Sequence, residues 1–161
     1  MNSRLIKILF SGAVGLYLSL VCLNNVVDYP SNFEFVRMVT QMTDTFSLER
    51  NGWRAIHHEG IQYALFILII GGEFSSALLI FTGVFRMIRR FRAPANEFRQ
   101  AKQAVTMGLA LGVLLWFTVF IAVGGEWFLM WQSKTWNAQN TGFQLTACFL
   151  LFLLYHTQKD A

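Results

Sequence analysis

The chain has few charged residues and very few cysteines. Only 14% of its 161 residues are Asp, Glu, Lys or Arg, whereas an average soluble domain carries roughly 25%. So few charges cannot cover the surface of a soluble globular domain, and a hydrophobic content of 55% is too high for a disordered chain. Two cysteines are too few for a disulfide framework or a zinc cluster. The composition therefore argues against a soluble enzyme and against a disulfide scaffold.

Long apolar segments decide the expected class of protein. A helix that crosses a bilayer needs about 20 mostly apolar residues, and segments 5–27, 61–85 and 104–131 reach that length. A fourth segment, 137–156, reaches it only by including Asn137, Asn140 and Gln144, which are tolerated where they face a bundle interior or water. The first segment is longer than a signal-peptide core and lacks its cleavage pattern. We therefore expect an all-α, polytopic membrane protein, a four-transmembrane-helix bundle forming one membrane domain, 1–161.

Lysine and arginine are unevenly distributed between the connections. Nine of the 13 lie near the chain ends or in segment 86–103, and four lie in the other connections. Because positive charge is retained on the cytoplasmic side, both termini and the basic loop 86–103 are expected in the cytoplasm, and loop 28–60 outside it. The net charge of +4 is then explained by orientation and by contact with anionic lipid. No nucleic-acid partner is expected.

The extracytoplasmic loop is expected to contain a short amphipathic helix. Ser31 and Glu34 have the spacing of a capping box, and apolar residues follow at helical intervals. Such a helix would lie on the membrane surface or cap the bundle, and Trp53 is expected to begin the helix of the second span. The apolar residues of the amphipathic helix are Phe35, Met38, Val39, Met42 and Phe46.

Glu73 is the clearest ionisable residue inside an expected span. It lies near the middle of the second span, and at 100° per residue it shares one helix face with Glu59, Gln62 and Ser76. Ionisable groups at such depth are costly and are functional candidates by default. This face is therefore expected to avoid lipid and to form a polar track from the outer surface to mid-depth.

A second glutamate lies near the outer end of the third span. Glu126 shares a helical face with Gly108 and Gly112, and such small residues let another helix approach closely. The Glu126 face is therefore expected to point into the bundle. Segments 71–73 and 124–126 both read Gly-Gly-Glu, and paired glycines beside a carboxylate could mark a loosened helix of the kind that builds transporter sites. Chance similarity between two apolar segments is the alternative.

Polar and aromatic side chains gather at the outer ends of all four spans. Two interpretations stay open: an outward-facing polar cavity that reaches Glu73 and is rimmed by tryptophans, or hydrogen bonds between helices with no ligand. For the tryptophans, simple anchoring at the membrane interface is a further alternative. The candidates for binding a ligand or a partner are Asn24, Asn25, Asp28, Trp53, His57, His58, Gln62, Glu73, Glu126, Trp127, Trp131, Trp136 and Asn137.

No metal, cofactor or catalytic residue is predicted. A bis-histidine haem needs histidines at similar depth on facing helices, but His156 lies at the opposite membrane side from His57 and His58. Neighbouring histidines on a helix point about 100° apart and rarely bind one ion. The chain also lacks a phosphate loop, a nucleophile elbow and an HExxH motif. An enzyme is therefore the third-ranked class of function.

Several segments resemble a known family. They are 24–32 (Asn-Asn-Val-Val-Asp-Tyr-Pro-Ser-Asn), 53–56 (Trp-Arg-Ala-Ile), the region around Glu73, and the tryptophan-rich segment from 124 to 137. Together they resemble a bacterial family of predicted small integral membrane proteins of unknown function (domain-of-unknown-function family 2165). The resemblance covers essentially the whole chain. It implies four spans in a bacterial inner membrane, and it implies no activity.

Two classes of function follow. The small size, the lack of a soluble domain and the small-residue helix faces favour an accessory or assembly subunit of a larger inner-membrane complex. The alternative is a protein that binds or transports a small solute, lipid, quinone or proton through the outer cavity. Four spans are few for an autonomous transporter, so this alternative would require a homo-oligomer. The expected partners are therefore the lipid bilayer together with other membrane subunits or further copies of the chain.

Overall fold

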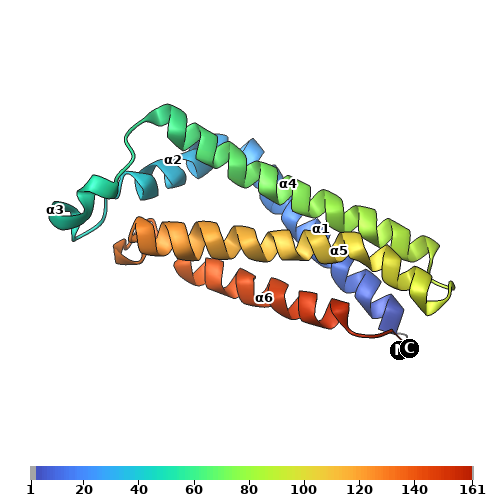
Figure 1. Ribbon diagram of the computed structural model, residues 1–161. Helices are drawn as coiled ribbons and strands as arrows, with labels where there is room; N and C mark the ends of the chain where they lie inside the picture. Colours follow the sequence, from blue (N-terminus) through green and yellow to red (C-terminus); the bar gives the residue numbers. More distant parts are fainter. Residues whose placement is uncertain (1–2, 161) are drawn as a thin grey trace.

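The structure, a computed structural model, describes residues 3–160, and no strand occurs among them. Four long helical segments lie side by side, with the short helices gathered at one end (Figure 1). In chain order the elements are α1 (Ser3–Val27), α2 (Tyr29–Thr40), α3 (Leu48–Asn51), the 3-10 turn η1 (Gly52–Arg54), α4 (Glu59–Arg89), α5 (Ala95–Leu115), the π-helical segment η2 (Trp116–Trp127), the 3-10 turn η3 (Met130–Gln132) and α6 (Gln139–Thr157).

Three helical segments are long and apolar enough to cross a membrane. They are Ser3–Val27, Glu59–Arg89 and Ala95–Trp127, with mean hydropathies of 2.0, 2.2 and 2.3 in their most apolar windows. The three longest apolar segments of the sequence therefore correspond to helices. The 19 residues of α6 fall outside this group, although α6 packs along α5 and η2.

Small residues let the long helices approach each other closely. A Cβ atom on Gly15 of α1 would lie 3.0 Å from the side chain of Ile80 of α4, and one on Gly108 of α5 would lie only 2.9 Å from the backbone oxygen of Ser76 of α4. Close approach of backbones strengthens dispersion contacts, which hold helices together where no water is present to drive them together. The apolar core around these contacts includes Val14, Leu18, Ala77, Ile80, Met87, Phe98, Val105, Leu109, Trp116 and Phe149.

The outer half of the third long segment is π-helical rather than α-helical. Segment η2 extends over 12 residues, whereas most π-helical stretches are single turns. Because a π-helical hydrogen bond spans one residue more than an α-helical one, each residue advances the side chains by less than 100°. The lag accumulates along η2, and Glu126 is consequently exposed on the outside of the helices. The prediction that Glu126 points into the bundle is wrong for this reason.

Both chain ends and the connection between α4 and α5 lie at the same end of the helices, which we call the terminal end (Figure 1). The connection itself covers only residues 90–94, because Arg86 and Arg89 belong to the last turns of α4, and Arg99 and Lys102 belong to α5. The predicted loop 86–103 was therefore too long. The basic residues continue the helices beyond their apolar parts instead of forming an extended loop.

At the opposite end, which we call the loop end, α2 packs against α4. The rings of Phe33 and Tyr63 stack with centroids 4.1 Å apart. A helix is present in this region, but it begins at Tyr29, directly after α1, with Pro30 in its first turn, and it ends at Thr40. Ser31 consequently lies inside the helix and makes no cap, so the capping-box prediction is wrong. Met42 and Phe46, which were expected on this helix, lie outside it.

The connection from α2 to α4 also departs from the sequence prediction. Trp53 lies in the short turn η1, and α4 begins only at Glu59 after an extended segment. The expectation that Trp53 begins the second span is therefore wrong. Gln62 of α4 holds this extended segment, because its Nε2 donates a hydrogen bond to the backbone oxygen of Ile56 over 2.7 Å.

Candidate functional site

A buried pair of polar side chains joins α1 to α4. Asn25 donates a hydrogen bond from Nδ2 to Oε2 of Glu73 over 2.7 Å. Glu73 is 1% exposed and Asn25 is 9% exposed. The two predicted candidates are thus brought together by the packing of the first and second spans. The pair can link the helices, and Glu73 is placed where it could bind a proton away from bulk water.

Three of the four residues predicted to share a polar face of α4 are buried. Gln62 and Ser76 are completely buried, like Glu73. Ser76 donates from Oγ to the backbone oxygen of Gly108 over 2.7 Å and so ties α4 to α5. Glu59, in contrast, is exposed at the start of the helix. Interhelical hydrogen bonding therefore accounts for Glu73 and Ser76.

Gln62 retains one unsatisfied atom. Its Oε1 atom is buried and has no hydrogen-bond partner, although Nε2 donates to Ile56. A buried amide oxygen without a donor costs about 1–3 kcal/mol. Oε1 of Gln62 is therefore a buried acceptor without a donor among the described residues.

Two tryptophans and an arginine form an exposed cluster at the loop end. The rings of Trp53 and Trp127 meet edge to face with centroids 5.7 Å apart. The guanidinium of Arg54 lies 5.4 Å from the ring centroid of Trp53 and 5.8 Å from that of Trp127, within the range of cation–π attraction. Arg54 thereby ties η1 to the end of η2. Trp53 nevertheless stays 72% exposed.

A second aromatic contact joins the chain between α2 and α4 to η3. Phe46 and Trp131 meet edge to face with centroids 6.0 Å apart. Phe46 is 77% exposed, and Trp127 and Trp131 are almost half exposed. We refer to Phe46, Trp53, Trp127 and Trp131 as the aromatic platform. Trp136 lies apart from it, against Phe35 of α2.

Hydrogen bonds hold the segments that carry the aromatic platform. One oxygen of Asp44 accepts from the hydroxyl of Ser133 over 2.7 Å and from the amides of Lys134 and Thr135 over 3.0 and 3.3 Å. These bonds, led by that from Ser133, lower the pKa of Asp44 below its ordinary value. The chain between α2 and α4 is therefore fastened to the chain that follows η3, and the aromatic platform rests on a defined backbone.

The remaining predicted candidates lie at the surface. The structure brings Asn25 and Glu73 together, and it separates both from Glu126. Among the described residues no group of three His, Cys, Asp or Glu side chains could hold a metal ion. The exposed candidates are Asn24, Asp28, His57, His58 and Asn137.

A buried charge cluster at the terminal end was not predicted. The carboxylate of Asp160 accepts one hydrogen bond from Nζ of Lys7 over 2.7 Å and another from Nζ of Lys102 over 2.8 Å. Both ammonium groups also donate to the backbone oxygen of Gln158. The side chains of all three charged residues are at most 5% exposed. The C-terminal segment is thereby fixed between α1 and α5.

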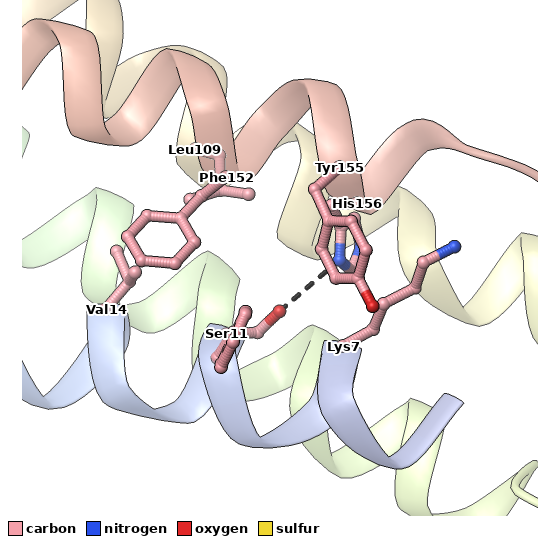
Figure 2. Close-up of a pocket in the computed structure, with 8 residues that line it drawn as sticks. Lys7, Ser11, Val14, Leu109, Phe152, Tyr155 and His156 are labelled. Atoms are coloured by element: carbon pink, nitrogen blue, oxygen red, sulfur yellow. Dashed lines mark hydrogen bonds between the residues drawn. The ribbon is translucent and has the colours of Figure 1, made fainter. Parts of the chain in front are cut away.

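A histidine and a serine continue this cluster into the helices (Figure 2). Nδ1 of His156 lies 3.4 Å from Oγ of Ser11, and Nε2 of His156 lies 3.4 Å from the backbone oxygen of Lys102. A carbonyl oxygen only accepts, so this geometry suits a neutral imidazole with its proton on Nε2. The cavity beside Ser11 and Tyr155 has a volume of about 10 Å³, which is close to the minimum for one water.

Opposing effects act on the pKa of Asp160. Burial raises it, but the hydrogen bonds and charges of Lys102 and Lys7 outweigh burial and leave the pKa below its ordinary value. No pattern in the sequence indicates this arrangement. From the sequence, Lys7 and Lys102 are interpreted only as positive charges that set the orientation of the protein in the membrane. Asp160 lies in a short polar segment without a recognisable motif.

The helices, their hydropathy and their buried polar contacts define a helical integral membrane protein. The chain belongs to the family described as predicted small integral membrane protein (DUF2165), whose sequence model matches residues 3–159. The family resemblance in the sequence is thereby confirmed. No curated protein and no solved structure matched the chain.

Proposed function

We propose that the protein is an accessory subunit of a larger complex in a bacterial inner membrane, bound to its partner through the aromatic platform. The single observation that carries this proposal is the exposure of Phe46 and Trp53, 77% and 72%, on a hydrogen-bonded backbone. Large aromatic side chains are enriched in the energetically dominant parts of protein interfaces. Fixing their backbone in advance lowers the entropy lost when a partner binds.

Anchoring at the membrane interface is the competing explanation for these aromatic residues. Such anchors stand level with the ends of the apolar helices. Trp127 is the last residue of η2 and lies at this level, whereas α3 and the adjoining chain project beyond the neighbouring long helices (Figure 1). Phe46 and Trp53 flank α3 in the sequence. Their position therefore favours contact with a protein partner over contact with lipid headgroups.

The proposal includes four spans, with both termini in the cytoplasm. The 19 residues of α6 correspond to about 28 Å at 1.5 Å per residue, close to the 30 Å thickness of a bilayer core. Gly142 lets α6 approach η2, because a Cβ atom at this position would lie 2.7 Å from Cβ of Phe120. Nine of the 13 basic residues belong to the terminal end, which is the cytoplasmic end by the positive-inside rule.

Purification from cells at native expression tests the proposed role. Wild-type protein, extracted in mild detergent, is expected to retain a stoichiometric membrane protein that mass spectrometry identifies. Trp53→Ala should reduce this retention at least about tenfold, the size of a strong interface residue. Phe74→Ala is the matched control, since Phe74 is 58% exposed on α4, away from the platform. A wild-type homo-oligomer, or equal losses in both variants, would contradict the proposal.

Cysteine labelling tests the four-span topology independently of any partner. In a chain with Cys22 and Cys148 replaced by Ala, a new cysteine is placed at Ser47 or at Arg92. An impermeant maleimide should label Ser47→Cys in intact cells and should label Arg92→Cys only after lysis. Labelling of Lys159→Cys in intact cells would place the C-terminus outside and would reduce the spans to three.

A second candidate function is proton binding or transfer by a homo-oligomer, and the Asn25–Glu73 contact favours it. Glu73 is 1% exposed, and an intramembrane carboxyl group is a recurrent proton carrier. In liposomes that contain a pH-sensitive dye, Glu73→Gln would abolish proton flux, whereas Glu126→Gln on the outer surface would leave it unchanged. Wild-type protein without flux above empty liposomes would exclude this function.

A further inference from the structure

A groove opens between α5 and α6 at the terminal end. Its volume is about 390 Å³, within the range of sites for small molecules. Arg99, Gln103 and Met107 lie four residues apart on one face of α5 and line it. The far wall comes from Thr157 of α6, and Lys102 and Thr106 complete the lining.

Met107 is the one apolar residue among the described residues that line the groove. Arg99 and Gln103 precede it on α5, whose mostly apolar part begins at Ala104. Met107, one turn further on, is 61% exposed. Beyond the groove, α5 continues on the same face with Leu114, which is also 61% exposed. A ligand that fits this lining has a charged or polar head joined to an apolar chain.

The charge around the groove selects an anion. The terminal end contains nine Lys and Arg residues but only two acidic residues, Glu97 and Asp160. Both carboxylates are already paired, Glu97 with Arg90 over 2.6 Å and Asp160 with two buried lysines. Arg99 is exposed and makes no ion pair with the described residues. Its five N–H donors suit a phosphate group.

We propose that this groove is a binding site for one anionic phospholipid, with its phosphate on Arg99 and Gln103 and an acyl chain along Met107 and Leu114. A soluble phosphate would explain the charge but not the exposed apolar side chains of Met107 and Leu114. A neutral phospholipid would explain those apolar side chains but would gain less from the surrounding positive charge. This site is independent of the proposed accessory role, because it concerns lipid and lies at the end of the helices opposite the aromatic platform.

Native mass spectrometry of protein extracted from nanodiscs tests the site. The nanodiscs contain phosphatidylcholine and phosphatidylglycerol in equal amounts, and the retained lipids are counted by mass. Wild-type protein is expected to retain phosphatidylglycerol preferentially. Arg99→Gln should lower that preference about fivefold, because one basic residue near an anionic surface contributes roughly that factor. Arg86→Gln is the matched control, since it removes the same charge from the end of α4 outside the groove.

Two further experiments distinguish binding of a phospholipid from binding of a soluble phosphate and from attraction to the basic end as a whole. Glycerol 3-phosphate, added in excess, should not displace the retained phosphatidylglycerol. Met107→Gln should weaken retention while leaving every charge in place. Displacement by glycerol 3-phosphate would assign the site to a soluble anion, and equal effects of Arg86→Gln and Arg99→Gln would assign the preference to the whole basic end. Either result would overturn the proposal.

Discussion

Asn25 and Glu73 share a hydrogen bond of 2.7 Å across the α1–α4 contact, and both side chains are buried. A polar contact at this depth is made only if two helices pack in one register. Because each group would otherwise stand unpaired among apolar side chains, the bond penalises other registers of α1 against α4. The pair thus specifies how α1 packs against α4. This structural role does not depend on whether Glu73 also binds or transfers a proton.

Asn25→Leu is expected to destabilise the protein by about 1–2 kcal/mol, since it leaves the Glu73 oxygen without its donor. Unfolding by SDS titration in mixed micelles would measure the change. Asn24→Leu is the matched control, because Asn24 is exposed and the change should cost less than about 0.5 kcal/mol. In a Glu73→Leu background the Asn25→Leu change should cost less than it does alone. An additive double mutant would show that the bond contributes nothing.

Asp160→Asn is expected to destabilise the terminal end by about 3 kcal/mol, because it removes the charge that two buried ammonium groups share. Thermal unfolding and digestion by carboxypeptidase would report the change. Lys159→Gln is the control, since Lys159 is exposed beside it. Equal stability of both variants would show that the cluster is unimportant for folding.

Acid should weaken the same cluster. The pKa of Asp160 in the folded protein lies below its ordinary value of 3.8. Its contribution to stability is therefore fully present above that value and is lost as the pH falls through the folded pKa. Melting temperatures of wild-type and Asp160→Asn proteins should differ at pH 7 and converge as the pH falls below about 4. A constant difference down to pH 3 would contradict this assignment.

Asp44→Asn is expected to loosen the chain after η3, because a neutral amide oxygen is a weaker acceptor than a carboxylate for Ser133, Lys134 and Thr135. Hydrogen exchange should accelerate at the amides of Lys134 and Thr135 while the α5 amides stay protected. Glu49→Gln changes an exposed acid in α3 and should leave exchange unaltered. Protection of residues 133–135 in the Asp44→Asn variant would exclude this anchoring role.

Gly108→Ala is expected to destabilise the α4–α5 contact by about 1–3 kcal/mol, the usual cost of overpacking. The new Cβ would lie 2.9 Å from the backbone oxygen of Ser76 and 2.6 Å from Ile80, and a backbone cannot move aside as a flexible side chain can. Gly71→Ala is the control, since no atom lies within 4 Å of the added Cβ. Thermal unfolding in detergent would separate the two, and equal melting temperatures would refute the close-packing argument.

Several features followed from sequence because they depend on local composition. The three longest apolar segments correspond to helices α1, α4 and α5 with η2. The polar face of α4 followed from the helical period, and Gln62, Glu73 and Ser76 are indeed buried. Local sequence does not predict the type of helix at segments 71–73 and 124–126. The same Gly-Gly-Glu sequence lies in an α-helix in the first segment and in a π-helix in the second.

The sequence by itself determined that the chain is helical, apolar and positively charged at one end. Hydropathy, helical periodicity and local charge can all be obtained from residues that are close together in the chain. Only the tertiary structure decided which polar groups meet. Asp160 reaches Lys7 and Lys102 across 153 and 58 residues of chain, and no local pattern encodes such a distance. The outward direction of Glu126 likewise depends on the unusual winding of η2, which changes the angle that the sequence period assumes.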